Sequence, residues 1–318
     1  MSAFVIGVSS KLDETSAVAL NLNGEVMGRV VGKTCSHVTL SRSMAQTRAI
    51  NIIDRLLLTL EHKREDCKCL LVSAAGIDSP KTKELVTECF AAAHMLCPVI
   101  CLNDGMIALY TTTRGLGIAA VSGKGSIVVG RNAAGEIARC GGYPISIHGD
   151  EGSAQWIALE ALHLASRWLD GDKPKTVLST ALDDYFCGLD IEKMTECARS
   201  LRRRPVDTAL ARLVIECAGN GDATSAAILR KGAGELFEVA QSCADRLHFM
   251  QEAPLRCGVW GDVFQHSECY QKEFERLFLA HYPNGRIIPP AVDEATGSAQ
   301  LALAYLNGEL SYITKFQF

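Results

Sequence analysis

An acidic residue follows a short apolar run at residues 99–102, in the triplet Asn103-Asp104-Gly105. Such a run is typical of a buried strand, and ligands of open α/β sheets gather beyond the carboxyl ends of the strands. A carboxylate at that place can accept a proton from a hydroxyl group. The alternative is that Asp104 only caps a following helix, and these residues alone favour neither interpretation.

A lysine between two glycines occupies the turn between two expected strands, residues 118–121 and 127–131. Glycines let backbone N–H groups approach phosphate oxygens without a Cβ in the way, and the lysine adds positive charge. The turn consists of Ser122, Gly123, Lys124, Gly125 and Ser126. An ordinary hairpin turn explains the same residues, so the motif indicates phosphate binding only together with others.

Two more glycine-rich segments have the composition of ligand-binding loops. Gly141-Gly142 leads to Gly149-Asp150-Glu151-Gly152-Ser153, just before an apolar helical run. Glycines around a paired acid indicate a backbone fitted closely to a polar ligand, although a double-acid helix start is the alternative. Residues 257–263 end a further strand with Gly261 and Asp262 at its tip, where a nucleotide base or ribose would fit.

A repeat of strands positions these motifs. The sequence predicts a three-stranded meander at residues 4–8, 16–22 and 26–31, with Asn23-Gly24 in its second hairpin. The same pattern returns roughly 110 residues later at 118–121, 127–131 and 137–140. Two copies of one supersecondary unit predict two similar lobes, with a boundary near residues 115–117.

Helices and continuous apolar strands follow each meander, as a parallel α/β sheet requires. The first half predicts helices at 41–61 and from Ser79-Pro80 onward, with strands at 69–73 and 99–102. In the second half, helices dominate 154–249, and strand 255–260, helix 268–281, strand 286–288 and helix 295–306 follow.

Composition excludes several classes of protein. The 318 residues suggest two domains, with 48% hydrophobic residues, 21% charged residues and a net charge of −4. Neither nucleic acid nor an anionic membrane is expected as a partner, and the basic run Arg202-Arg203-Arg204 is interpreted as a solvated helix end. The 13 cysteines are interpreted as mostly reduced, half-buried residues of a cytoplasmic protein, with a metal site as the alternative.

Together these motifs resemble the N-acetylglucosamine kinase family, within the BadF/BadG/BcrA/BcrD ATPase group of the actin-like ATPase and sugar kinase superfamily. The resemblance spans about residues 6–303 and is firmest over 102–156. It implies an α/β protein with two RNase H-like lobes, residues 1–116 and 117–318, and a ligand cleft between them. The second lobe would contain a helical insertion, and the last helix would pack back toward the first lobe. ATP, Mg²⁺, a small-molecule sugar and a homodimer are implied as well.

The resemblance also implies roles for individual residues. Asp104 matches the catalytic base. The implied substrate-binding residues are Ser36, His37, Asn103, Asp104, Gly142, Asp150 and Glu151. The implied nucleotide-binding residues are Lys11, Ser122, Gly123, Lys124, Gly125, Ser126, Gly261 and Asp262.

The sequence departs from the family at its first phosphate loop. That loop normally reads acid-Gly-Gly-Gly-Thr, whereas this chain has Ser9-Ser10-Lys11-Leu12-Asp13. The acid that helps to hold hydrated Mg²⁺ is therefore replaced by Ser9, and side chains stand where backbone should meet phosphate. We expect weak ATP binding from this loop, with Lys11 partly replacing the charge of the metal.

The first hypothesis is an ATP-dependent kinase that phosphorylates a hydroxyl of an amino sugar, such as N-acetylglucosamine or glucosamine, or of a related metabolite. The second is a non-catalytic sugar-binding or regulatory protein of the same fold, which the altered first loop favours. The third is a dehydratase activator with an iron–sulfur cluster at a dimer interface. The high cysteine content favours this third hypothesis, but no cysteine lies in a motif that matches such activators.

Overall fold

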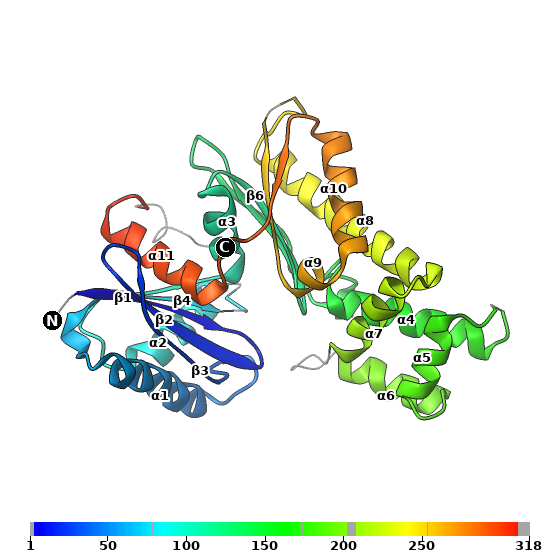
Figure 1. The fold of residues 1–318 in the computed structure, drawn as a ribbon, viewed down its shortest axis with the longest axis horizontal. Coiled ribbons are helices and arrows are strands. Elements are labelled where there is room, and N and C mark those ends of the chain that lie inside the picture. The colour runs from blue at the N-terminus through cyan, green and yellow to red at the C-terminus, as the bar shows by residue number, and fades with distance from the viewer. Residues whose placement is uncertain are drawn as a thin grey trace. The chain divides into compact units, whose positions relative to one another are not determined.

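The chain divides into two compact units in the computed structural model (Figure 1). The first unit contains residues 1–114 and 290–318, and the second contains residues 115–289. The structure describes residues 3–74, 76–77, 79–172, 174–201, 208–252 and 254–310, so Asp78 and the run Arg202-Arg203-Arg204 lie outside the described residues. The division falls two residues before the expected boundary, and the last helix belongs to the first unit.

A five-stranded mixed sheet forms the centre of the first unit, in the order β3-β2-β1-β4-β5. The expected meander is antiparallel, whereas β4 and β5 continue the sheet in parallel with β1. Its strands are β1 (Phe4–Ser10), β2 (Glu14–Asn21), β3 (Val26–Lys33), β4 (Cys67–Ala74) and β5 (Val99–Leu102). All seven residues of β1 are buried, because this central strand has helices on both faces.

Helices α1 (Arg42–Leu60) and α2 (Pro80–Ala91) pack on one face of this sheet. Ser41 and Ser79 cap their N-termini, and Pro80 stands at the first position of α2, where its missing N–H has no partner to lose. Helix α11 (Glu294–Leu306) packs on the other face, next to α3 (Asp104–Thr113).

Gly7 explains how closely α11 approaches β1. A Cβ at Gly7 would lie 2.1 Å from the backbone nitrogen of Ala299, so only glycine allows this contact. Arg29 of β3 also forms an ion pair with Asp293, the N-cap of α11, at 2.6 Å. These contacts attach a helix from the end of the chain to the first unit.

The second unit repeats the sheet of the first, in the order β10-β9-β6-β7-β8. Its antiparallel meander is β6 (Gly117–Ser122), β7 (Ser126–Arg131) and β8 (Ile137–Gly141), and its parallel strands are β9 (Arg256–Trp260) and β10 (Arg286–Ile288). Strand β6 thus corresponds to β1, β9 to β4 and β10 to β5. The repeat in the sequence is confirmed as a repeat of the fold.

Helices make up most of the remaining second unit, as the sequence predicts. They are α4 (Ala154–Leu169), α5 (Val177–Tyr185), α6 (Ile191–Leu201), α7 (Ala209–Gly219), α8 (Ala223–Arg246), α9 (Asp262–His266) and α10 (Glu268–His281). Two short 3₁₀ turns, Arg64–Asp66 in the first unit and Ile145–Ile147 in the second, complete the described elements.

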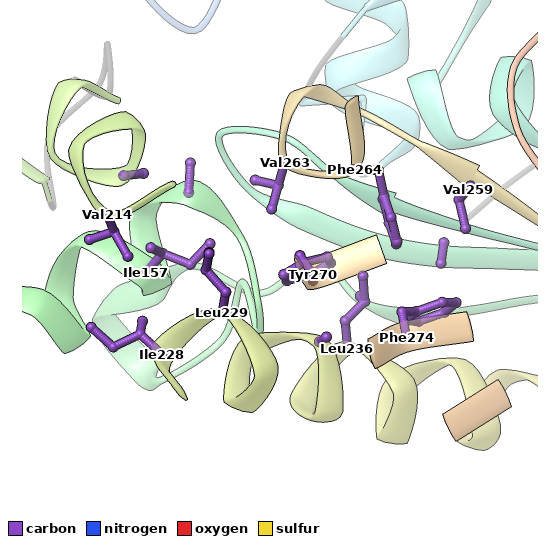
Figure 2. Close-up of a cluster of buried hydrophobic side chains, with 14 of the residues drawn as sticks. Ile157, Val214, Ile228, Leu229, Leu236, Val259, Val263, Phe264, Tyr270 and Phe274 are labelled. Carbon is purple, nitrogen blue, oxygen red and sulfur yellow. The ribbon is translucent and has the colours of Figure 1, made fainter. Parts of the chain in front are cut away.

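The core of the second unit lies between the sheet and helices α8 and α10. Figure 2 shows Tyr270, Phe274 and Leu236 in this cluster, and all three side chains are fully buried. Phe264 packs edge-to-face on both Tyr270 and Phe274, with ring centroids 5.1 and 5.2 Å apart. Each such aromatic pair adds about 0.5–1.5 kcal/mol beyond its burial. These contacts hold α10 in place, and Tyr270 of α10 also contacts the loop at residues 149–153.

Candidate functional site

In the first unit, polar residues meet where three parallel strands end. Ser9 of β1 pairs with Ser73 of β4, and Ser73 pairs with Leu102, the last residue of β5. Asn103 and Asp104 follow directly. This edge is where the topology of an open α/β sheet places ligands.

Asp104 is the first residue of α3 and is half-buried. The N-cap of α3 is Asn103, whose side chain accepts a hydrogen bond from the Gly105 N–H at 2.9 Å. The interpretation of Asp104 as the cap is therefore wrong. Asp104 Oδ1 accepts a second hydrogen bond from the same N–H at 3.0 Å.

Asn103 is itself buried, and its side-chain amide donates to the Ile77 carbonyl at 3.3 Å. Both ends of the amide group are therefore engaged within the first unit. The structure places Asn103 as the residue that orients the start of α3, and its direct contact with substrate remains a prediction.

The altered first loop is a tight hairpin between β1 and β2. The Lys11 N–H donates to the Glu14 carbonyl at 2.9 Å, and Ser10 still belongs to β1. Leu12 is buried, with 8% exposure, whereas Lys11 is exposed. The Leu12 side chain therefore packs into the protein, and whether this hairpin crowds a phosphate stays a prediction.

Ser36 and His37 lie beside this hairpin, in the segment after β3. The Thr34 hydroxyl donates to the Lys11 carbonyl at 2.6 Å and accepts from the Ser36 N–H at 2.9 Å. The Ser36 hydroxyl accepts from the Val38 N–H at 3.3 Å. Thr34 therefore joins the predicted nucleotide-binding and substrate-binding segments of the first unit, a role that the sequence analysis missed.

In the second unit, the turn between β6 and β7 contains the predicted phosphate-binding residues. The Gly123 N–H donates to the Gly125 carbonyl at 2.9 Å, which closes a three-residue turn between the paired residues Ser122 and Ser126. Among the described residues, a Cβ at Gly123 would meet only the Gly125 carbonyl oxygen, at 4.0 Å. The turn is thus open to a ligand at Gly123.

The N-terminus of α4 forms backbone hydrogen bonds with this turn. The Ala154 N–H donates to the Gly123 carbonyl at 2.9 Å, and the Gln155 N–H donates to the Lys124 carbonyl at 3.3 Å. Ser153, the N-cap, accepts from the Trp156 N–H at 3.2 Å. Because the first N–H groups of α4 are used in this way, the helix orients the turn rather than offering those groups to an anion.

Asp150 forms a hydrogen bond with the same turn. Its Oδ1 accepts a hydrogen bond from the Ser126 N–H at 3.0 Å, and the residue is 7% exposed. A Cβ at Gly125 would lie 2.5 Å from that oxygen, so glycine is required for the contact. Asp150 also adopts a left-handed backbone, with φ of 52°. This contact places Asp150 at the predicted phosphate turn, and its role toward sugar hydroxyls remains a prediction.

Gly152 and Gly261 bring two distant segments to the end of β6. The Gly152 carbonyl accepts hydrogen bonds from the Ser122 hydroxyl and the Tyr270 hydroxyl, both at 2.9 Å. Burial raises the pKa of the Tyr270 phenol, so this donor keeps its proton. Gly261 has φ of 103°, and a Cβ there would lie 2.3 Å from the Ser122 carbonyl oxygen. The predicted phosphate turn at 122–126, the predicted substrate-binding segment at 149–153 and Gly261 therefore converge in the second unit.

The remaining predicted residues lie around this centre. Gly142 has φ of 73°, and its carbonyl accepts from Arg139 Nη2 at 3.1 Å. Glu151 is half-buried, and its Oε2 atom is buried without a hydrogen-bond partner in the part of the chain that the structure describes. Asp262 is exposed at the start of α9.

Ser73 and Glu294 are residues that the sequence analysis missed. Glu294, the first residue of α11, is only 8% exposed and accepts a hydrogen bond from the Ser73 hydroxyl. Among the described residues, no cluster of three or more His, Cys, Asp or Glu side chains could hold a metal. Mg²⁺ in phosphoryl-transfer sites needs only one or two carboxylates beside the phosphates. The carboxylate of Glu294 and the hydroxyl groups of Ser9 and Ser73 are oxygen ligands of the kind that Mg²⁺ takes.

The thirteen cysteines are all free thiols, and most are buried. The Sγ atoms of Cys67 and Cys97 lie 3.7 Å apart, near the ends of β4 and β5 opposite the polar edge. No described helix is long and apolar enough to cross a membrane.

The two repeated sheets, each with its parallel strands beyond a meander, define the fold of actin-like ATPases and sugar kinases. The model of the BadF/BadG/BcrA/BcrD ATPase family matches residues 13–299. The chain belongs to this family.

Relatives agree with this assignment. An N-acetylmuramic acid/N-acetylglucosamine kinase of Clostridium acetobutylicum is 28% identical over 305 residues, which are 94% of this chain and 98% of the relative. A candidate N-acetylglucosamine kinase of Chromobacterium violaceum matches with a TM-score of 0.75 and 19% identity, over 95% of this chain and 99% of that one. A glucokinase of Streptomyces griseus, solved with glucose and AMPPNP, matches with a TM-score of 0.60 and 14% identity over 94% and 99% of the two chains.

Proposed function

We propose that this protein transfers the γ-phosphate of ATP to a hydroxyl group of an amino sugar, with N-acetylglucosamine and N-acetylmuramic acid as the first candidates. The observation that carries the proposal is the 28% identity to a kinase of these sugars over 94% of this chain. The convergence of residues 122–126, 149–153 and 261 in the second unit supports it, because distant segments are joined there by glycine-dependent contacts.

In this proposal individual residues have separate roles. Asp104 accepts the proton of the attacking hydroxyl, a role that typically contributes about 10²–10⁴-fold to the rate. The open turn at Gly123, with Lys124, binds phosphate oxygens, and α4 and Asp150 hold that turn in place. Mg²⁺, when bound with ATP, neutralises phosphate charge.

A sugar-binding protein without phosphoryl transfer is the second candidate. The glycine-free hairpin at Lys11 favours it, because backbone N–H groups are less accessible there than in a glycine loop. Separate binding measurements distinguish the candidates. A ligand at 100 times its Kd stabilises a fold by about 2.7 kcal/mol.

The test is thermal unfolding with Mg-ATP, with each amino sugar, and with both together. The kinase predicts stabilisation by Mg-ATP alone and by sugar alone. Stabilisation by sugar but never by nucleotide would reject the kinase and support the second candidate. Glucose and free acetate serve as controls for the sugar specificity.

Lys11 gives a further prediction for the first hairpin. Because Leu12 is buried and Lys11 is exposed at the hairpin, we expect the Lys11 ammonium to contact phosphate oxygens. Lys11→Met keeps most of the side-chain length but removes the charge. We expect it to weaken Mg-ATP binding about tenfold, or about 1.4 kcal/mol, in titration calorimetry.

Lys11→Arg is the matched control and should retain most of the affinity. The crowding interpretation predicts the opposite, namely that removing the ammonium group tightens Mg-ATP binding. Equal or tighter binding by Lys11→Met would therefore remove Lys11 from the nucleotide site.

A further inference from the structure

The polar edge of the first unit contains one hydroxyl group that its neighbours do not satisfy. Ser9 is 2% exposed, and its Oγ atom has no hydrogen-bond partner in the described part of the chain. Buried hydroxyl groups are nearly always hydrogen-bonded, and an exception indicates a missing water, ion or ligand. This observation is independent of any comparison with relatives.

The register of the sheet shows which way Ser9 points. Gly7, two residues earlier on β1, faces the backbone of α11, so Ser9 faces the same side. Ser9 and Ser73 are paired on neighbouring parallel strands, and paired residues project to one face. Ser9, Ser73 and the start of α11 therefore share one side of the sheet.

Glu294 brings a carboxylate to this position. It is only 8% exposed at the first residue of α11, and its Oε1 atom accepts the hydrogen bond from the Ser73 hydroxyl. Buried acids are rare unless they are paired, and a single serine leaves most of the acceptor capacity of a carboxylate unused. The carboxylate thus lies beside the position of Ser9, although it comes from the other end of the chain.

We propose that Glu294, with Ser9 and Ser73, forms a site for hydrated Mg²⁺, and that Glu294 supplies the carboxylate that residue 9 lacks. The proposal rests on the proposed function only in that Mg²⁺ is the ion that accompanies ATP. Mg²⁺ takes oxygen ligands, keeps several of its waters and needs few protein carboxylates. An acidic side chain and two hydroxyl groups match this preference.

A purely structural role predicts different behaviour. If Glu294 only attaches α11 to β4, its hydrogen bond with Ser73 matters and its charge does not. Glu294→Gln separates these roles because glutamine keeps the size and an acceptor for Ser73 but removes the charge. Asp293→Asn is the matched control, since it removes the neighbouring carboxylate at the same helix end and keeps an N-cap residue.

The experiment measures Mn²⁺ binding by electron paramagnetic resonance, with Mn²⁺ in place of Mg²⁺, without nucleotide and with AMPPNP. We expect Glu294→Gln to bind Mn²⁺ at least about tenfold more weakly than the wild type in the AMPPNP samples, about 1.4 kcal/mol. Asp293→Asn should bind it like the wild type. Thermal unfolding of each variant shows whether it is folded.

A carboxylate exchange makes the test sharper. The double variant Ser9→Asp with Glu294→Gln returns an acid to the neighbouring strand position, and we expect it to recover Mn²⁺ affinity to within about threefold of the wild type, about 0.7 kcal/mol. Equal Mn²⁺ affinity of Glu294→Gln and the wild type would overturn the proposal, as would a wild type that binds no Mn²⁺ under either condition.

Sugar phosphorylation is measured in a separate assay, so that a failure of the metal site can be distinguished from a failure of the proposed kinase activity. A protein that binds Mn²⁺ through Glu294 but phosphorylates no amino sugar supports the metal site and rejects the kinase. A protein that phosphorylates sugar while Glu294→Gln keeps full Mn²⁺ affinity overturns only the metal site.

Discussion

Asp104→Asn is expected to reduce sugar phosphorylation by about 10²–10⁴-fold, because asparagine cannot accept the proton of the attacking hydroxyl. Asparagine keeps the size of the side chain and an oxygen that can accept from the Gly105 N–H. Affinities for Mg-ATP and for sugar should therefore stay within about tenfold of the wild type, or about 1.4 kcal/mol. Steady-state turnover with calorimetric binding of each ligand checks both statements.

Thermal unfolding provides the control for Asp104→Asn. The loss of a negative charge in the first turn of α3 should cost about 0.3–1 kcal/mol of stability, which leaves the protein folded. A variant that kept more than about a tenth of wild-type turnover would show that Asp104 is not the base, since a general base contributes at least about a hundredfold.

Asp150→Ala is expected to affect both the fold and the site. It leaves the buried Ser126 N–H without its acceptor, which costs about 1–3 kcal/mol of unfolding free energy. It also places alanine at a φ of 52°, a left-handed conformation that aspartate and asparagine adopt more readily. If the carboxylate also binds sugar hydroxyls, sugar affinity falls by about 2 kcal/mol or more.

Asp150→Asn separates the two effects. Asparagine keeps an oxygen acceptor for the Ser126 N–H and tolerates the left-handed backbone, so the unfolding temperature should stay close to that of the wild type. The loss of charge should still weaken sugar binding in calorimetry. Unchanged sugar affinity in Asp150→Asn would give Asp150 a purely structural role as the brace of the turn at residues 122–126.

The sequence was sufficient to predict the two repeated sheets. The meanders are visible as apolar strands separated by Asn-Gly and Gly-Lys-Gly turns, and the continuous apolar runs identify the parallel strands. The order of the motifs also indicated which strand ends carry polar residues. These features depend on local patterns, which a single sequence displays directly.

The position of α11 and the environment of Glu294 depended on tertiary packing instead. Nothing local distinguishes Gly7 from a glycine in any other strand, although its contact with Ala299 brings the end of the chain to β1. Glu294 follows the helix cap Asp293, where an acid is usually exposed, so its burial beside Ser73 could not be read from the sequence.

³¹P nuclear magnetic resonance measures directly whether this protein makes a phosphosugar. The protein is incubated with ATP, Mg²⁺ and either N-acetylglucosamine or N-acetylmuramic acid, with Asp104→Asn in parallel. We predict a new sugar phosphomonoester signal that grows in step with ADP for at least one of the two sugars, and that grows at least about a hundredfold more slowly for Asp104→Asn. ATP that remains unchanged, or ADP that forms at the same rate without sugar, would show that the protein is not a kinase of these sugars.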